Sequence, residues 1–147
     1  MRRILTSSIA FGLVTGVLAA TPAAQAQSAT LTVSVTGVRN ANGNVRCGLY
    51  ASAETFPKPG QEYRGVVGRI SGQQATCVFG SLAPGTYAVA AFHAEQGETQ
   101  MQYGMFGKPK EGYGFSRNPS SSFGAPSFSA AAFNFSGNQT LQVTLQY

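Results

Sequence analysis

The residues best suited to chemistry gather in one stretch of the sequence, Ala90 to Ser116. It contains the chain's only histidine, His93, and three of its five acidic residues, Glu95, Glu98 and Glu111. A histidine can act as a general base or a metal ligand, and carboxylates can transfer protons or bind cations. The stretch therefore has three interpretations: a catalytic site, a metal site, or a strand that ends in a loop.

The sequence lacks the residue combinations that common hydrolytic mechanisms require. A Ser–His–Asp triad cannot form because the sequence contains no aspartate, and no nucleophile-elbow motif accompanies a glutamate substitute. Two glutamates at glycosidase spacing would have to meet through folding, since no pattern in the sequence pairs them. We therefore expect a protein that is not an enzyme. The catalytic alternative is a periplasmic hydrolase that uses Glu111 and His93.

The sequence also lacks the ligand sets, motifs and basic charge that metal, cofactor and nucleic-acid sites require. Structural zinc needs about four Cys, His or carboxylate ligands, and calcium needs about six to eight oxygens. The glycine-rich GKPKEGYG follows no strand and precedes no helix, so it does not match a phosphate-binding loop. Loss of Arg2 and Arg3 with a signal peptide would lower the formal net charge from +5 to +3, too little for a nucleic-acid footprint. We expect no metal, no cofactor and no nucleic acid.

The region 94–130 departs from the strand pattern of the rest of the chain. Gly, Ser, Pro and Lys dominate it, yet six aromatic residues run through it, whereas disordered segments are poor in aromatics. It therefore reads as a long, ordered, irregular loop, the kind of element on which binding residues are common. The candidate ligand contacts are His93, Glu95, Tyr103, Glu111 and Tyr113.

Three functional hypotheses follow from these residues. The first is an exported, non-catalytic binding or interaction module that acts through the 94–130 loop on an unknown envelope ligand or protein. The second is a purely structural envelope protein, whose loop only caps the fold. The third is the hydrolase. A strand-end histidine bonded under the loop and a loop carboxylate that pairs with backbone amides or Lys108 are the structural readings of His93 and Glu111.

The elements that must position this loop are strands. Apolar and polar residues alternate with a period of two, and no long window has a helical period. Turn residues at 40–44, 71–74 and 137–138 predict hairpins. The pattern predicts an all-β, antiparallel Greek-key sandwich of about seven strands, immunoglobulin-like or prealbumin-like. The expected strands lie at 29–39, 45–52, 65–70, 74–82, 83–93, 131–137 and 139–147.

The two cysteines, Cys47 and Cys77, occupy the apolar face of their expected strands. Val45 and Leu49 share the face of the first, and Phe79 shares that of the second. An even cysteine count in an exported chain predicts a disulfide, worth about 3–4 kcal/mol for a loop of roughly 30 residues. Two buried free thiols are the alternative.

The first 26 residues have the pattern of a signal peptide. Arg2 and Arg3 precede an apolar run over 9–20, Pro22 breaks the run, and Ala24-Gln25-Ala26 fits a cleavage site. We expect cleavage near Ala26, a single domain over 27–147 without a transmembrane segment, and delivery to the periplasm or the medium.

Several motifs resemble known proteins. The stretch SLAPGTYAVAAFH resembles a turn and core strand of prealbumin-like sandwiches. GKPKEGYGFSRN, FGAPSFSAAAF and the opening TVSVTGVRNANGNVRCGLY resemble a family of uncharacterised bacterial secreted proteins, a domain-of-unknown-function family, over about 31–147. The resemblance implies an exported β-sandwich and no assigned activity. Members carry a pattern such as His-Asp-x-Asn-x-Asn, reminiscent of a cation-binding loop, after this strand; here Ala94, Glu95 and Glu98 follow His93.

Overall fold

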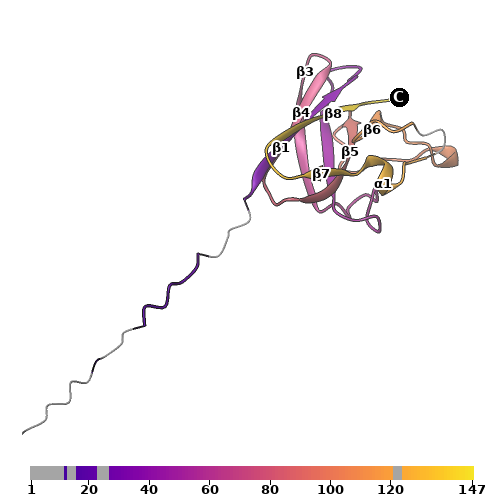
Figure 1. Ribbon diagram of the computed structural model, residues 1–147. Helices are drawn as coiled ribbons and strands as arrows, with labels where there is room; N and C mark the ends of the chain where they lie inside the picture. The colour runs from indigo at the N-terminus through magenta and orange to yellow at the C-terminus, as the bar shows by residue number, and fades with distance from the viewer. Residues whose placement is uncertain (1–11, 13–15, 23–26, 121–123) are drawn as a thin grey trace, which may run out of the picture.

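The computed structural model describes residues 12, 16–22, 27–120 and 124–147. Most of the expected signal peptide, with its cleavage site, lies outside these residues, as does Phe123. Figure 1 shows strands curled around a common interior, with the connection after β5 and the helix α1 to one side. The elements are β1 (Ala29–Thr36), β2 (Asn44–Tyr50), β3 (Arg64–Ser71), β4 (Gln74–Leu82), β5 (Gly85–Ala94), η1 (Met105–Gly107), β6 (Tyr113–Phe115), α1 (Phe128–Ala131), β7 (Phe133–Phe135) and β8 (Gln139–Thr144).

The strands form one curled sheet that is nearly a barrel. Its order is β6-β5-β2-β3-β4-β1-β8, and β7 pairs with β5 outside this path. The two ends of the path meet after β8, where Tyr113 N donates to Gln146 O at 2.9 Å and Gln146 N donates to Tyr113 O at 2.8 Å. Gly114 permits this approach, because a Cβ there would lie 2.4 Å from Thr144 O.

The expected all-β class is confirmed, but the antiparallel Greek-key sandwich is not. The sheet is mixed, because β8 runs parallel to β1 from Leu31↔Gln139 to Thr36↔Thr144. This direction follows from the connection. After β5 and the long loop, β7 runs antiparallel to β5 and ends beside the start of β5. β1 begins at that same end of the barrel, so β8 enters there and runs alongside β1 in the same direction. The register places Val143 opposite Val35, and both side chains are fully buried.

One of the three predicted hairpins is confirmed. β3 and β4 pair through Ser71↔Gln74, and Gly72 takes the positive φ of +63° that this tight turn requires. The turn at 40–44 exists, but it joins β1 to β2, which are not neighbours in the sheet. The turn at 137–138 joins β7, which pairs with β5, to β8, which pairs with β1. Turn residues predicted that the chain bends, not which strands then pair.

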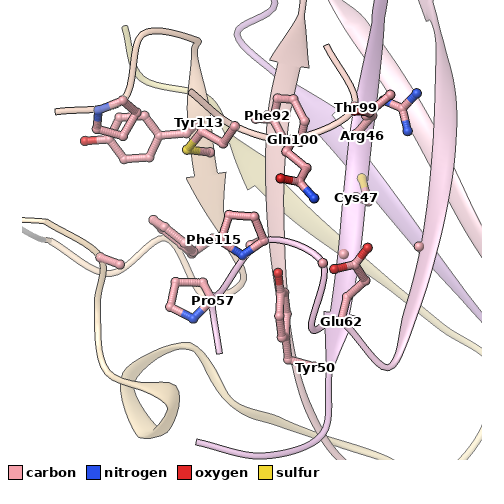
Figure 2. A pocket seen from close by; sticks show the side chains of 18 of the residues that line it. Arg46, Cys47, Tyr50, Pro57, Glu62, Phe92, Thr99, Gln100, Tyr113 and Phe115 are labelled. Carbon is pink, nitrogen blue, oxygen red and sulfur yellow. The ribbon is translucent and has the colours of Figure 1, made fainter. Parts of the chain in front are cut away.

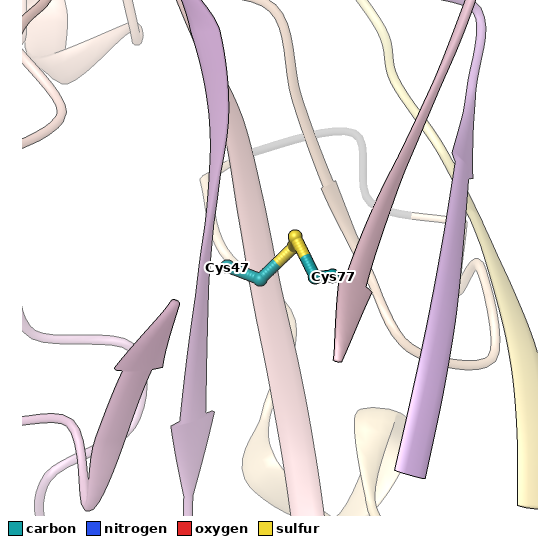
Figure 3. Close-up of a disulfide and its surroundings, with 2 residues drawn as sticks. All are labelled: Cys47 and Cys77. Atoms are coloured by element: carbon teal, nitrogen blue, oxygen red, sulfur yellow. A yellow bond between two sulfur atoms is a disulfide. The ribbon is translucent and has the colours of Figure 1, made fainter. Parts of the chain in front are cut away.

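The interior holds the main apolar core and the disulfide. The buried alternation of β2 and β4 places Cys47 and Cys77 inside, and the two sulfurs are bonded (Figure 3). Because β3 separates β2 from β4 in the sheet, the bond crosses the interior. Gly68 of β3 leaves room for it: a Cβ there would lie 3.0 Å from Cys77 Sγ and 2.8 Å from Thr76 O. The predicted disulfide is therefore present in the structure.

A second, smaller core lies on the outer face of the sheet. Alternate residues of β5 face outward, and there Ala88 is fully buried beneath other segments. Rings from the 51–63 connection, β6 and α1 cover it, so the 94–130 region packs onto the sheet through ordered rings. The buried members of this outer core are Tyr50, Phe56, Ala88, Phe115 and Ala131.

Candidate functional site

A cavity of about 480 Å³ lies on the outer face of the sheet, beside the outer core (Figure 2). Its floor comes from β2, β3 and β5, and its walls come from the 57–62 connection, residues 99–109, β6 and residues 124–125. The residues that line it are Arg46, Cys47, Gly48, Tyr50, Pro57, Pro59, Gly60, Glu62, Gly65, Val66, Val67, Ala90, Phe92, Thr99, Gln100, Met101, Tyr103, Gly107, Pro109, Tyr113, Phe115, Gly124 and Ala125.

Small residues on outward-facing positions make the floor. Gly48 of β2 pairs directly with Gly65 of β3 and with Ala90 of β5. A Cβ on Gly48 would lie 3.1 Å from the Tyr50 ring and 3.4 Å from Glu62 Cβ, and one on Gly65 would lie 3.6 Å from Glu62 Oε1. The glycine pair therefore leaves the space that the Glu62 side chain and the cavity occupy.

Aromatic rings form much of the wall. Tyr113 and Phe115 are edge-to-face neighbours with centroids 5.9 Å apart, and the Tyr103 side chain stands at the rim, 50% exposed. Tyr50 Oη donates to Lys58 O at 3.2 Å. Burial, and then the nearby Glu62 and Tyr103, raise the pKa of Tyr50 to about 12, so its hydroxyl is neutral at physiological pH.

The two ends of the cavity differ in character. Figure 2 shows Tyr113 and Phe115 at one end, and Arg46, Glu62 and Thr99 at the other. One end is thus apolar, and the other offers both signs of charge. Such a mostly apolar pocket with a few polar groups is the usual form of a small-molecule site.

Buried hydrogen bonds hold the cavity's outer wall against the sheet. Ser116, directly after β6, is fully buried. Its Oγ donates to Ala131 O and accepts from Val89 N, while Ser116 N donates to Val89 O at 2.9 Å. Glu111, also buried, accepts from Gln102 N at 2.9 Å. These bonds fix β6, α1 and the base of the 102–110 loop.

The structure divides the five candidate contacts between two places. Tyr103 and Tyr113 line the cavity. His93, Glu95 and Glu111 do not line it. His93 and Glu95 lie at one end of the barrel, while Glu111 braces the loop through Gln102 N as just described. Among the described residues, neither a hydrogen bond nor an ion pair joins the His93 ring to the Glu111 carboxylate. The His93 side chain bonds Asn42 and Tyr147, outside the 94–130 loop, whereas Glu111 pairs with a backbone amide as its structural reading expects.

His93 is fully buried in a hydrogen-bond chain that reaches the C-terminal residue. Its Nε2 lies 2.8 Å from Asn42 O, and because a carbonyl only accepts, Nε2 is the protonated nitrogen. In the neutral ring Nδ1 then accepts from Tyr147 Oη at 2.8 Å. Tyr147 Oη in turn accepts from Arg39 N at 3.1 Å. Both ring nitrogens are therefore engaged within the protein.

Glu95 extends this cluster to the surface. Arg39 Nε donates to Glu95 Oε1, and the Arg39 guanidinium lies 4.6 Å from the centre of the Tyr147 ring. The hydrogen bond from Arg39 is the largest cause that lowers the pKa of Glu95 below its usual value. This arrangement ties the turn before β2, the end of β5 and the C-terminus together.

Replacement of Tyr147 by phenylalanine tests this cluster. The change keeps the ring but removes the hydroxyl that bonds His93 Nδ1 and Arg39 N, so a buried ring nitrogen loses its partner. We expect Tyr147→Phe to lower the free energy of unfolding by about 1–3 kcal/mol in urea denaturation. Tyr63→Phe is the control, since Tyr63 is 59% exposed; equal midpoints for both variants would contradict the prediction.

Sequence reasoning missed the polar end of the cavity. Arg46 lies on β2, and Glu62 and Tyr50 lie in or beside the 51–63 connection, all outside the 94–130 loop that was expected to carry the site. One signal was present: Tyr50 and Phe92 occupy the outward positions of two adjacent strands, where an exposed face would carry polar residues. Large rings on an outward face indicate that another segment covers it.

The described residues contain neither a cluster of metal ligands nor a helix that could span a membrane. Among residues 12, 16–22, 27–120 and 124–147, no group of three or more His, Cys, Asp or Glu side chains is arranged to hold a metal ion. In the same residues, no helix has the length and apolar character needed to cross a bilayer.

Comparison with known proteins places the chain in a family. No curated protein matches it, and no solved structure matches it. A family model described as an uncharacterised protein conserved in bacteria (DUF2141) matches residues 33–143, which is more than half of the chain and includes the whole cavity. The chain therefore belongs to this bacterial family of uncharacterised proteins, DUF2141.

Proposed function

We propose that this protein is an exported, non-catalytic binding protein that holds a small molecule with an apolar body in the cavity. The observation that carries the proposal is the cavity of about 480 Å³ with its small floor and aromatic wall. Ligand sites commonly measure roughly 300–1,000 Å³ and have this composition. Part of the wall comes from residues 99–109, so the 94–130 loop contributes to binding through Tyr103 and Tyr113.

Export to the periplasm or the medium is part of the same proposal. The signal-peptide pattern of residues 1–26 supports it. The Cys47–Cys77 disulfide supports it independently, because such bonds persist mainly in oxidising compartments.

The two other hypotheses have less support. A purely structural envelope protein has no need of an aromatic cavity beside a well-packed outer core. A hydrolase based on His93 and Glu111 would need both groups free to reach substrate, but His93 bonds Tyr147 and Asn42, and Glu111 bonds Gln102 N. The binding role therefore explains more of the structure.

A cavity-filling variant tests the proposal. Gly65 has negative φ and only ordinary contacts around a notional Cβ, so Gly65→Leu keeps the strand while its side chain fills the floor. We expect the neutral fluorescent probe N-phenyl-1-naphthylamine to bind the wild type and to bind Gly65→Leu at least about tenfold more weakly.

Gly80→Leu is the matched control. Gly80 lies on β4, does not line the cavity and has nothing within 4 Å of a notional Cβ, so probe binding should stay at the wild-type level. Circular dichroism checks that both variants fold. Equal binding by the wild type and folded Gly65→Leu would overturn the proposal and favour the structural hypothesis, as would a wild type that binds neither this probe nor smaller phenyl compounds.

A further inference from the structure

The polar end of the cavity holds two opposite charges without partners. Arg46 and Glu62 both line it, and within the described part of the chain neither side chain makes an ion pair or a hydrogen bond. The Arg46 Nε is buried and has no acceptor. A buried donor without a partner costs free energy, which a ligand acceptor would recover. Glu62 is exposed at this end, so water solvates its carboxylate, and the buried Nε of Arg46 is the donor that a ligand acceptor would satisfy.

The strand register brings these two charges to the same end. Arg46 and Gly48 are two residues apart on β2 and face the same way, about 7 Å from each other along the strand. The Glu62 side chain lies over Gly48 and its partner Gly65, with Oε1 3.6 Å from the Cβ position of Gly65. One small ligand can therefore meet both charges, although they do not pair with each other.

From this arrangement we infer that the cavity binds a small zwitterion with an aromatic body, an aromatic amino acid or a close derivative. Its carboxylate pairs with the Arg46 guanidinium and its ammonium group pairs with the Glu62 carboxylate. Its ring packs against Tyr113 and Phe115 at the apolar end, where aromatic pairs are favourable. This inference rests on the proposed ligand-binding role of the cavity and names its ligand class.

A set of four probes separates the charges of the ligand. Isothermal titration calorimetry of the oxidised wild-type chain would use L-phenylalanine, 3-phenylpropionate without the ammonium, 2-phenylethylamine without the carboxylate, and neutral 2-phenylethanol. We expect L-phenylalanine to bind most tightly and removal of either charge to weaken binding about tenfold or more, since bonds to charged groups are the stronger ones.

Two variants assign each charge to a residue. Arg46→Met should abolish the preference for a carboxylate, so that L-phenylalanine and 2-phenylethylamine bind equally. Glu62→Gln should abolish the preference for an ammonium group, so that L-phenylalanine and 3-phenylpropionate bind equally. Arg69→Met and Glu54→Gln are the matched controls, because both residues are exposed and neither lines the cavity; they should keep the wild-type order.

The outcomes distinguish this inference from the proposed function. If 2-phenylethanol or either singly charged probe binds the wild type as tightly as L-phenylalanine, the zwitterion is wrong and the cavity remains a binding site. If none of the four binds while N-phenyl-1-naphthylamine binds the wild type and not Gly65→Leu, the ligand class is wrong and the proposed function stands. If no probe of either experiment binds, the proposed function itself fails.

Discussion

Reduction of the Cys47–Cys77 disulfide is expected to lower the free energy of unfolding by about 3–4 kcal/mol. The bond closes a sequence separation of 30 residues and links β2 to β4 across the interior, where both cysteines are almost fully buried. In the chain-entropy view, the cross-link acts by restricting the unfolded chain. Small domains are typically stable by about 5–15 kcal/mol, so the disulfide supplies a substantial share of the total.

Urea denaturation of the oxidised protein and of the protein in excess phosphine reductant measures this effect. The double variant Cys47→Ala, Cys77→Ala is the control, since its midpoint should not respond to reductant. An unchanged wild-type midpoint after complete reduction, verified by thiol titration, would contradict the prediction. Because the cysteines do not line the apolar end of the cavity, ligand probes at low temperature should still bind the reduced, folded protein.

The faces of the strands could be predicted from the sequence, but their partners could not. The expected inner residues Val45, Cys47 and Leu49 are all buried, because alternation directly records which side of a strand meets the core. Alternation is the same for parallel and antiparallel neighbours, so it did not reveal that β8 runs parallel to β1. Pairing is decided by the long connection and by side-chain fit across the whole interior.

The turn at Asn42-Gly43 shows how tertiary packing overrides a local signal. Gly43 has the positive φ of +65° that such turns use. A Cβ there would collide with Ala94 O, so the turn lies against the end of β5 and does not fold β2 back on β1. The neighbouring Asn42 carbonyl accepts from His93, which fixes the turn in this place.

The candidate site was predictable only in part. The aromatic content of the 94–130 region predicted an ordered loop, and its Tyr103 and Tyr113 line the cavity. The charges of the cavity come from elsewhere, because Arg46 is brought to it by strand pairing and Glu62 by a separate connection. The spacing of Arg46 and Glu62 along the sequence does not indicate that folding brings them to one cavity. Whether these residues contact a ligand stays a prediction.

Replacement of Phe115 by alanine is expected to cost about 3–5 kcal/mol, the usual range for a buried phenylalanine. Phe115 is 8% exposed in the outer core, and its ring centroid lies 5.8 Å from that of Phe56 in an edge-to-face contact. It also forms part of the cavity wall. The variant should therefore lose both the packing of the outer layer and the shape of the site.

The location of this loss is as informative as its size. The outer core lies on the far side of the sheet from the disulfide and the main core, so its opening need not unfold the barrel. In Phe115→Ala we expect amide hydrogen exchange to rise in β6, α1 and the 94–130 loop, while β1 and β4 stay protected, as for a local opening. Phe135→Ala is the matched control, because Phe135 is 2% exposed in the main core and its loss should raise exchange throughout.

Uniform exchange in both variants would mean that the two cores unfold as one unit. Selective exchange in Phe115→Ala would instead mean that the cavity wall is a separately stabilised layer on a rigid barrel. A layer of this kind can adjust to a ligand without disturbing the disulfide-linked interior, because the two clusters share the sheet and little else. A less stable outer layer would have to be ordered when the ligand binds, and this ordering would reduce the observed binding free energy.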